Sequence, residues 1–568
     1  MKKLLSALLV FALLFSVVAC GNGDNKESPA SVPANSETSA ASEAGSPSPS
    51  QSAAPGNSTT PAPSASPSSN LTATESIAPP EEGTKFKEHI EVIWDQSSSV
   101  INVHSIAGGG QVNVSAYMMI HAALVMNSAT GGESYPWIAS SWETDDYITW
   151  IFHLRDDVYF HNGDKVTAED VVWTYNEALK NVGSQAYNIW AQGGYITDVK
   201  ALDDYTVQMD LSVPYFEGYR LVGGAAGACI LSKRAIEEDG EKGQWIGAGP
   251  WKITGFSTND YITFERNDDY FGELPYTKTM TWKYIPEGGS RTIMMENGEA
   301  DLAVGIPMTD LEIFRSNPKY GIVSAESNGP VSIMFNLADP VCNDWNFRMA
   351  VASAIDREMI VALSGNLATA MSEDEASVWG KVTPYRDTDI RHVPYDLDKA
   401  REYLAASLYD GTPIELTAMT QESRTAEAIQ WMLKEIGLDI TLNIMEMASL
   451  FAYTGWGTTD SQMVFWTATF GLTPTRIYAN TLCDGGINNR MNYVNPELEE
   501  LTASTVSITD EDVRKATLYR MQEIIAEDMP LIPVFWIEQA VVTVAGFEGV
   551  VIGAMGTFDF VYAYVPEG

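Results

Sequence analysis

Apolar residues recur with two different periods along most of the chain, as expected when strands and helices alternate. The segment TWIFHLR, residues 149–155, predicts a strand. The helix after it is predicted to begin near Thr167, which stands three residues before Asp170 as in a capping box. Val171 and Tyr175 then lie on its apolar face. This alternation predicts an α/β fold.

Further helices are predicted in the second half of the chain. One covers residues 346–363, one starts from the N-cap Asn495, and one carries an apolar stripe that must stop before Pro530. These stripes indicate core packing and carry no chemistry. From about residue 85 onward the sequence is continuously globular, without a repeat of fixed period or a second apolar run of membrane length.

The first twenty residues have the pattern of an export signal. Lys2 and Lys3 precede an apolar run over residues 4–18, which is too short to span a bilayer comfortably. Val-Val-Ala then leads into Cys20, which resembles the bacterial lipobox, in which the cysteine is lipidated. A lipoprotein signal peptide over 1–20 is therefore predicted, with a membrane anchor at Cys20; a plain secretory peptide with a chance cysteine is the alternative.

Residues 21–84 are rich in Ser, Ala and Pro and contain no aromatic residue, so they cannot form a core. We expect a disordered linker that holds the globular part away from the membrane, or a neutral spacer without a functional length. The linker and the acidic composition resemble those of surface lipoproteins of Gram-positive bacteria. The predicted location is the extracytoplasmic face of the cell membrane.

Charge and motif content exclude several functions. The 568 residues hold 34 Lys and Arg against 75 Asp and Glu, a formal charge of −41, which excludes nucleic-acid binding. The histidines form no HxxxH or HExxH pair, so neither a metal nor another cofactor is expected. The globular part has no GxSxG or SxxK motif, and the adjacent acids Asp156 and Asp157 would point to opposite faces of a strand. No catalytic residue is predicted.

Several segments, in this order, are similar to those of the solute-binding proteins of the peptide/nickel class of ABC importers, family 5. The most specific is residues 136–179, with a Trp-containing turn, an F-x-L-R strand, an F-H-x-G turn and a T-A-x-D-V helix. Residues 247–272, 292–307 and 331–361 continue the resemblance, which covers essentially all of the chain from Lys85 onward.

The resemblance implies a two-lobed periplasmic-binding-protein (Venus-flytrap) fold with an accessory subdomain in lobe one. Ligand would be trapped between the lobes as they close. The implied boundaries are 85–327 for lobe one with its accessory subdomain at about 130–195, 328–529 for lobe two, 530–568 for the return to lobe one, and hinges near 328–331 and 529–533.

The resemblance also implies a ligand-binding loop. Peptide-binding members usually carry W-x-x-D-Y, in which the Asp pairs with the ligand's ammonium group and the Trp lines a side-chain pocket. Here Trp466 matches the Trp, Thr469 stands at the Asp and Phe470 at the Tyr. Met447 follows Glu446 where family members often have a Trp. The expected charge is missing, and an unpaired buried ammonium group costs several kcal/mol.

Two explanations are open. A neutral ligand such as an oligosaccharide stacks on Trp466 and Phe470, or a shifted loop lets Asp460, Glu446 or Asp484 supply the charge.

A metal chelate is less favoured as the ligand, because His392 is the only histidine of the implied second lobe. Cys342 and Cys483 would share that lobe, and their pairing in a disulfide is open.

The sequence thus predicts a monomeric, lipid-anchored binding protein that delivers a peptide-like or oligosaccharide ligand to the membrane subunits of an ABC permease. It is not expected to be an enzyme. A secreted glycoside or peptide hydrolase and a ligand sensor for a membrane receptor are the alternatives.

Overall fold

The structure is a computed structural model. All of the residues that it describes belong to one compact unit within Pro61–Gly568. The described residues are 80, 83–105, 110–128, 134–182, 184–190, 195–224, 227–307, 309–363, 368–370, 379–380, 383–454, 461–467, 474–486, 488–553 and 557–567.

Eleven strands of the described residues form a single mixed sheet that passes through two hydrophobic cores. The order along the sheet is β15-β14-β16-β12-β17-β11-β1-β10-β9-β8, and β13 pairs with β17. These strands are β15 (Ile440–Met445), β14 (Ile414–Met419), β16 (Met463–Thr467), β12 (Tyr320–Phe335), β17 (Leu531–Val544), β11 (Leu302–Val304), β1 (His89–Trp94), β10 (Thr279–Tyr284), β9 (Tyr261–Arg266), β8 (Trp251–Ser257) and β13 (Ala368–Ala370).

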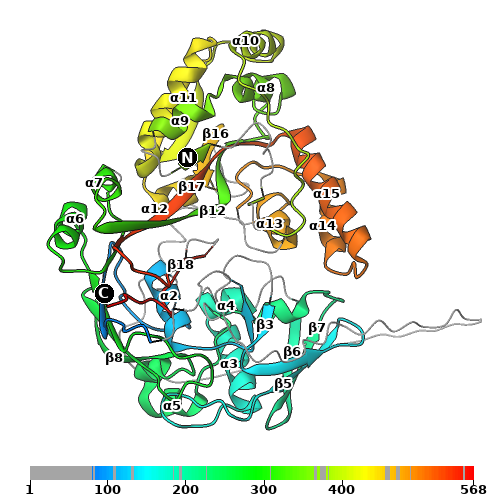
Figure 1. Ribbon diagram of the computed structural model, residues 1–568. Helices are drawn as coiled ribbons and strands as arrows, with labels where there is room; N and C mark the ends of the chain where they lie inside the picture. Colours follow the sequence, from blue (N-terminus) through cyan, green and yellow to red (C-terminus); the bar gives the residue numbers. More distant parts are fainter. Residues whose placement is uncertain are drawn as a thin grey trace, which may run out of the picture. The chain divides into compact units, whose positions relative to one another are not determined.

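The two long strands β12 and β17 connect the cores. They run antiparallel and side by side (Figure 1), from the pair Tyr320–Val544 to the pair Met334–Leu531. Their register is irregular between Glu326 and Pro330. An irregularity in two adjacent strands is a place where a sheet bends, so this point is suited to a hinge.

The packing of β17 shifts the expected crossing point. Ile532, Val534 and Phe535 lie in the core of β14 and β16, whereas Val541 belongs to the core that contains β1 and β10. The strand therefore leaves the second core several residues after the expected boundary at residue 530. The domain boundaries stay a prediction; along β17, Ile537 still packs against the core of β14 and β16, and Val541 already belongs to the other core.

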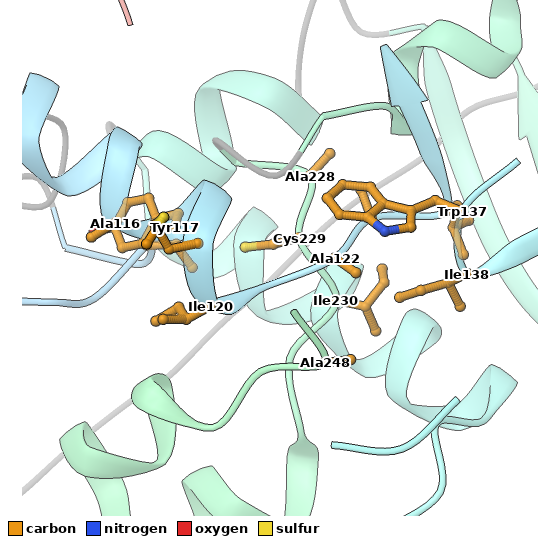
Figure 2. Packing of buried hydrophobic residues seen from close by; sticks show 14 of the residues in the cluster. Ala116, Tyr117, Ile120, Ala122, Trp137, Ile138, Ala228, Cys229, Ile230 and Ala248 are labelled. Carbon is orange, nitrogen blue, oxygen red and sulfur yellow. The ribbon is translucent and has the colours of Figure 1, made fainter. Parts of the chain in front are cut away.

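Helix α2 (Gln111–Ile120) anchors the first core. Figure 2 shows Tyr117 and Ile120 of this helix beside Cys229 and Ala248, with Trp137 at the other side of the cluster. A separate antiparallel sheet of order β4-β5-β7-β6 packs with helix α3 in the same core. These elements are β4 (Ala139–Glu143), β5 (Thr149–Leu154), β7 (Thr206–Leu211), β6 (Ile196–Asp203) and α3 (Ala168–Lys180).

No helix within the described ranges combines the length and the apolar character that crossing a membrane requires. The described residues also form further helices and short strands. These elements are β2 (Val125–Asn127), β3 (Ser134–Pro136), α4 (Gln185–Trp190), η3 (Gly218–Val222), α5 (Lys233–Asp239), η4 (Gly240–Trp245), α6 (Gly288–Glu296), α7 (Leu311–Arg315), α8 (Trp345–Ala354), α9 (Arg357–Leu363), α10 (Leu397–Ala406), η5 (Thr420–Glu422), α11 (Ser423–Glu435), α12 (Met447–Tyr453), α13 (Pro474–Thr481), α14 (Pro496–Thr505), α15 (Glu511–Asp528), β18 (Val551–Ile552) and β19 (Phe558–Asp559).

Several local predictions are confirmed. The strand over residues 149–155 is β5, and the capping box of Thr167 and Asp170 starts α3. Asn495 caps α14 by accepting a hydrogen bond from the backbone N–H of Leu498. Helix α15 ends at Asp528, before Pro530 as predicted.

The prediction of one helix over residues 346–363 is wrong. The segment forms two helices, α8 and α9, because Ile355 has extended backbone angles, with φ −88° and ψ 111°. Asp356 then begins the second helix, since its Oδ1 accepts a hydrogen bond from the backbone N–H of Met359 at 3.0 Å. The apolar pattern continues across the break because both helices bury residues in the same core.

The sequence left a disulfide between Cys342 and Cys483 open. In the structure both thiols are free, so this disulfide is absent. The thiol of Cys342 donates to the carbonyl of Gln462, and that of Cys483 donates to the hydroxyl of Thr502. The two cysteines belong to different hydrophobic clusters, so their packing holds them apart.

Candidate ligand-binding site

Trp466 lies near the end of β16, next to the long strand β12. Strand β16 lies between β14 and β12, and Trp466 is opposite Ser332 of β12. Its neighbours in the strand, Val464 and Phe465, are fully buried on opposite faces, in different clusters. Trp466 is half-buried against the cluster that contains Val464 and Tyr478. The strand thus holds a partly accessible indole at a fixed position.

A buried arginine supports this indole from one side. The Arg490 guanidinium lies 5.3 Å from the centre of the Trp466 ring, which is a cation–π contact. Arg490 is only 2% exposed. Its Nη1 donates to the hydroxyl of Thr454 at 2.6 Å and to the carbonyl of Thr454 at 3.3 Å. Burial lowers the pKa of Arg490 to about 10, so the side chain still carries its charge near neutral pH.

Arg490 also brings the end of a second element to the indole. Thr454 caps the C-terminus of α12, the helix that begins at Met447. Arg490 therefore links the C-terminal end of α12 to Trp466, whereas Met447 lies at the opposite end of that helix. Thr469 and Phe470, which were predicted beside Trp466, lie outside the described residues, and so does Cys20.

The acids considered as replacements for the missing charge are only partly described. Glu446 is exposed at the start of α12, and its Oε1 accepts a hydrogen bond from the hydroxyl of Thr420 at 2.9 Å. Asp484 is exposed, and its backbone N–H donates to the carboxylate of Glu499. Asp460 lies outside the described residues. No contact places either described acid at Trp466.

Three glutamine side chains form a row of hydrogen bonds from the first lobe to the long strand β17. The Gln96 amide donates to the amide oxygen of Gln111 at 3.0 Å, and Gln111 donates to that of Gln539 at 3.2 Å. Gln539 is in β17 opposite Ala325. Because amides both donate and accept hydrogen bonds, this row can bind the polar groups of a neutral ligand.

The two lobes also touch directly at a place outside this row. The backbone N–H of Phe216 donates to the carbonyl of Val506 at 3.2 Å, and the Arg514 guanidinium lies 3.6 Å from the centre of the Phe216 ring. Val506, from the second lobe, is buried in the core of the first. These contacts join the two lobes at this place.

The sequence alone did not indicate Arg490 or the glutamine row. Arg490 acts through Thr454, which is 36 residues away in the chain, and the Gln111–Gln539 bond joins residues 428 apart. The available signal was a lone arginine in NNRMNY, in an acidic chain.

The sequence model of the family described as bacterial extracellular solute-binding proteins, family 5 Middle, matches residues 133–488. The nickel-binding periplasmic protein of Escherichia coli K12 is 28% identical over 393 residues, which are 64% of this chain and 72% of that protein. The periplasmic oligopeptide-binding protein OppA of the same organism is 26% identical over 496 residues, covering 80% and 88%.

Solved structures show the same fold. The ABC transporter substrate-binding protein CtaP of Listeria monocytogenes has a TM-score of 0.76 at 22% identity, covering 85% of this chain and all of that one. NikA of Brucella suis, in complex with Fe(III)-EDTA, has a TM-score of 0.74 at 22% identity over 85% and 100%. The oligopeptide-binding protein AppA of Bacillus subtilis, with a nonapeptide, has a TM-score of 0.67 at 21% identity over 85% and 100%. The predicted two-lobed α/β fold is thereby confirmed.

Proposed function

This chain belongs to the bacterial extracellular solute-binding proteins of family 5, and from that premise we propose that it captures a peptide-like ligand between its lobes and delivers it to the membrane subunits of an ABC permease. The relatives named as oligopeptide-binding proteins support the class of ligand. The observation that carries the proposal is the half-buried indole of Trp466, held by the buried guanidinium of Arg490.

The charge behind Trp466 determines what its other face can bind. A cation on one face of an indole draws on the electron density that would otherwise attract a second cation to the opposite face. The site therefore disfavours an ammonium group at Trp466, in agreement with Thr469 at the position of the family's Asp. We expect a neutral part of the ligand, such as a side chain or a peptide group, to stack there.

An oligosaccharide is the second candidate. The same observation favours it, because a sugar ring also stacks on an indole without bringing a positive charge, and because the row from Gln96 to Gln539 offers neutral hydrogen-bonding groups.

Native mass spectrometry of the gently purified protein distinguishes the two ligands. A retained set of peptide masses supports the first proposal, and masses spaced by hexose units support the second. The same preparation tests for turnover. A binding protein returns its ligand intact at one-to-one saturation, whereas the appearance of cleaved product would replace transport by the hydrolase alternative. Closure on the ligand without permease coupling would instead support the sensor.

Replacing Trp466 with alanine is expected to weaken binding of the ligand so identified by about 1 to 3 kcal/mol, or roughly 5- to 150-fold, because the stacking surface is lost. Isothermal titration calorimetry measures the change. The matched control is Trp431→Ala, since Trp431 of α11 is 51% exposed and should leave the affinity unchanged. Equal affinity of the Trp466 variant and the wild type would remove Trp466 from the site.

We also propose that acyl chains on Cys20 anchor the protein to the outer face of the membrane. Acyl chains on Cys20 would bind the bilayer through their buried methylene groups. Cys20→Ser should therefore move the protein from the membrane fraction to the soluble fraction, as measured by fractionation and immunoblotting. Cys229→Ala, which changes a buried thiol, should stay with the membranes. Continued membrane association of the Cys20 variant would contradict the anchor.

A further inference from the structure

A small cavity lies in the second lobe at the base of β17. It has a volume of about 60 Å³ and opens between the end of α8, the start of α9, the segment before α10, and α15. Its lining includes three basic side chains, those of Arg357, Arg391 and His392, and the first residues of β17 as far as Pro533. One water molecule needs roughly 10–15 Å³ on this measure, so the cavity holds a group of a few atoms and excludes a peptide or a sugar.

Arg357 is buried beside this cavity and has no acidic partner among the described residues. The residue is 9% exposed. Its Nε donates to the carbonyl of Pro533 at 3.1 Å, and its Nη1 donates to the carbonyl of Val393 at 3.5 Å. Both carbonyls belong to residues of the lining. In the part of the chain that the structure describes, Arg357 forms no ion pair with a carboxylate.

The charge of Arg357 is consequently unbalanced. Burial lowers the pKa of Arg357 to about 10, which leaves it charged at neutral pH, and no acid raises this pKa. A buried charge costs free energy unless an opposite charge or sufficient hydrogen bonds compensate it. The two carbonyls use two of the five N–H donors of the guanidinium. Oxyanions match the remaining donors, because the planar guanidinium pairs with two oxygens at once.

Two polar side chains of the described residues near the cavity, Asp387 and Gln522, form hydrogen bonds with other groups. Asp387, which is buried four residues before Arg391, accepts a hydrogen bond from the backbone N–H of Asp389 and is absent from the lining. The amide of Gln522, which does line the cavity, donates to the carbonyls of Tyr385 and Leu518. The described residues of the lining include no carboxylate, in a chain whose formal charge is −41.

We propose that this cavity binds a small oxyanion, a phosphate or carboxylate group, on Arg357, at a site separate from the one at Trp466. The wall of the cavity includes Leu531, Ile532 and Pro533, the beginning of the strand that continues into the first lobe. An anion here ties the segment before α10 to the base of that strand. Because the anion binds only the folded chain, the stability of the protein increases as the anion concentration increases.

Thermal unfolding of the purified full-length protein tests the site. Phosphate or acetate is added at constant ionic strength against sodium chloride, and isothermal titration of the same anions gives the affinity directly. We expect a saturable rise in Tm with at least one of them. A rise with phosphate alone identifies a phosphate group, and a rise with acetate alone identifies a carboxylate. No saturable rise with either anion would overturn the proposal.

Two variants locate the effect. Arg357→Met keeps the volume of the side chain and removes its charge, and should lose at least tenfold in anion affinity. Arg401→Met is the matched control, because Arg401 is exposed on α10 and pairs with Asp398, and its anion response should equal that of the wild type. An unchanged response of Arg357→Met would overturn the assignment. If that variant does not fold, Ala352→Leu, which fills the cavity from α8, must abolish the response instead.

Discussion

Replacing Gly247 with alanine is expected to destabilise the protein by more than about 3 kcal/mol, because there is no room for a side chain at this position. An added Cβ would overlap the carbonyl oxygen of Ile120 and lie 2.6 Å from Nδ1 of His121. The backbone cannot move away easily. The carbonyl of Gly247 accepts a hydrogen bond from the N–H of His161 at 2.8 Å, and its N–H donates to Nδ1 of the same histidine at 3.2 Å.

The site of this change lies next to Ala248 in the cluster that Figure 2 shows, so the strain would fall on the first core. Urea denaturation measures the loss. The matched control is Gly289→Ala in α6, where an added Cβ meets nothing within 4 Å, and a gain of up to about 1 kcal/mol is expected from helix propensity. Wild-type stability of the Gly247 variant would contradict the inference that this position has no room for a side chain.

Acidification from pH 7 to pH 4.5 is expected to destabilise the protein by roughly 3 kcal/mol, the net of about 5 kcal/mol lost through His121 and His161 and about 2 kcal/mol gained through Asp559. Burial lowers the pKa of His121 to about 3 and that of His161 to about 4. Burial also lowers the pKa of His104, near which Glu177 acts in the opposite direction. The unfolded chain takes up protons on these groups below about pH 6.5, whereas the folded chain does not. Stability is therefore lost as the pH falls from about 6.5 toward 4.

Acids whose pKa values are raised by burial, among them Asp170, Glu422 and Asp559, oppose this loss. Burial raises the pKa of Asp559 to about 6, so the folded chain binds a proton there that the unfolded chain does not bind until about pH 4. Asp559 thus stabilises the fold as the pH falls from 6. This gain offsets only part of the stability that is lost through His121 and His161.

Urea denaturation at a series of pH values gives the slope of the free energy of unfolding against pH. His121→Phe keeps an aromatic ring but cannot take up a proton, and between pH 6 and 4.5 its stability should fall by about 1.4 kcal/mol per pH unit less than that of the wild type. A slope unchanged in the His121 variant would show that this histidine does not titrate as its burial requires.

The local elements were predictable because their signals are local. The capping box of Thr167 and Asp170 involves residues three apart, and the N-cap of α14 lies directly before its first turn. The break at Ile355 was missed because an apolar residue with an extended backbone leaves the apolar pattern unchanged. Periodicity reports which residues are buried, and both helices bury theirs in one core.

The candidate site was predictable only as far as a family motif reaches. Trp466 came from the W-x-x-D-Y pattern, and the strand that holds it is described by the structure. Arg490 was missed because its role depends on two contacts, with Thr454 and Trp466, that join separate segments of the chain. The Gln111–Gln539 hydrogen bond likewise requires both ends of the chain. Such contacts follow from the tertiary fold and have no signature in spacing.

The return of the chain to its first core has a consequence for the order in which the protein acquires its structure. Strand β11 pairs with β1 and β17, and Phe558, Phe560 and Ala563 are all buried in the core that begins at Ile90. The core of the first lobe is therefore complete only after residues 558–563 have been synthesised, while the core of the second lobe needs the chain only as far as the first part of β17. Since domains generally fold as units during synthesis, the second lobe has the earlier opportunity to fold. A nascent chain stalled before β17 would carry an unfinished N-terminal half and be an early target of proteolysis.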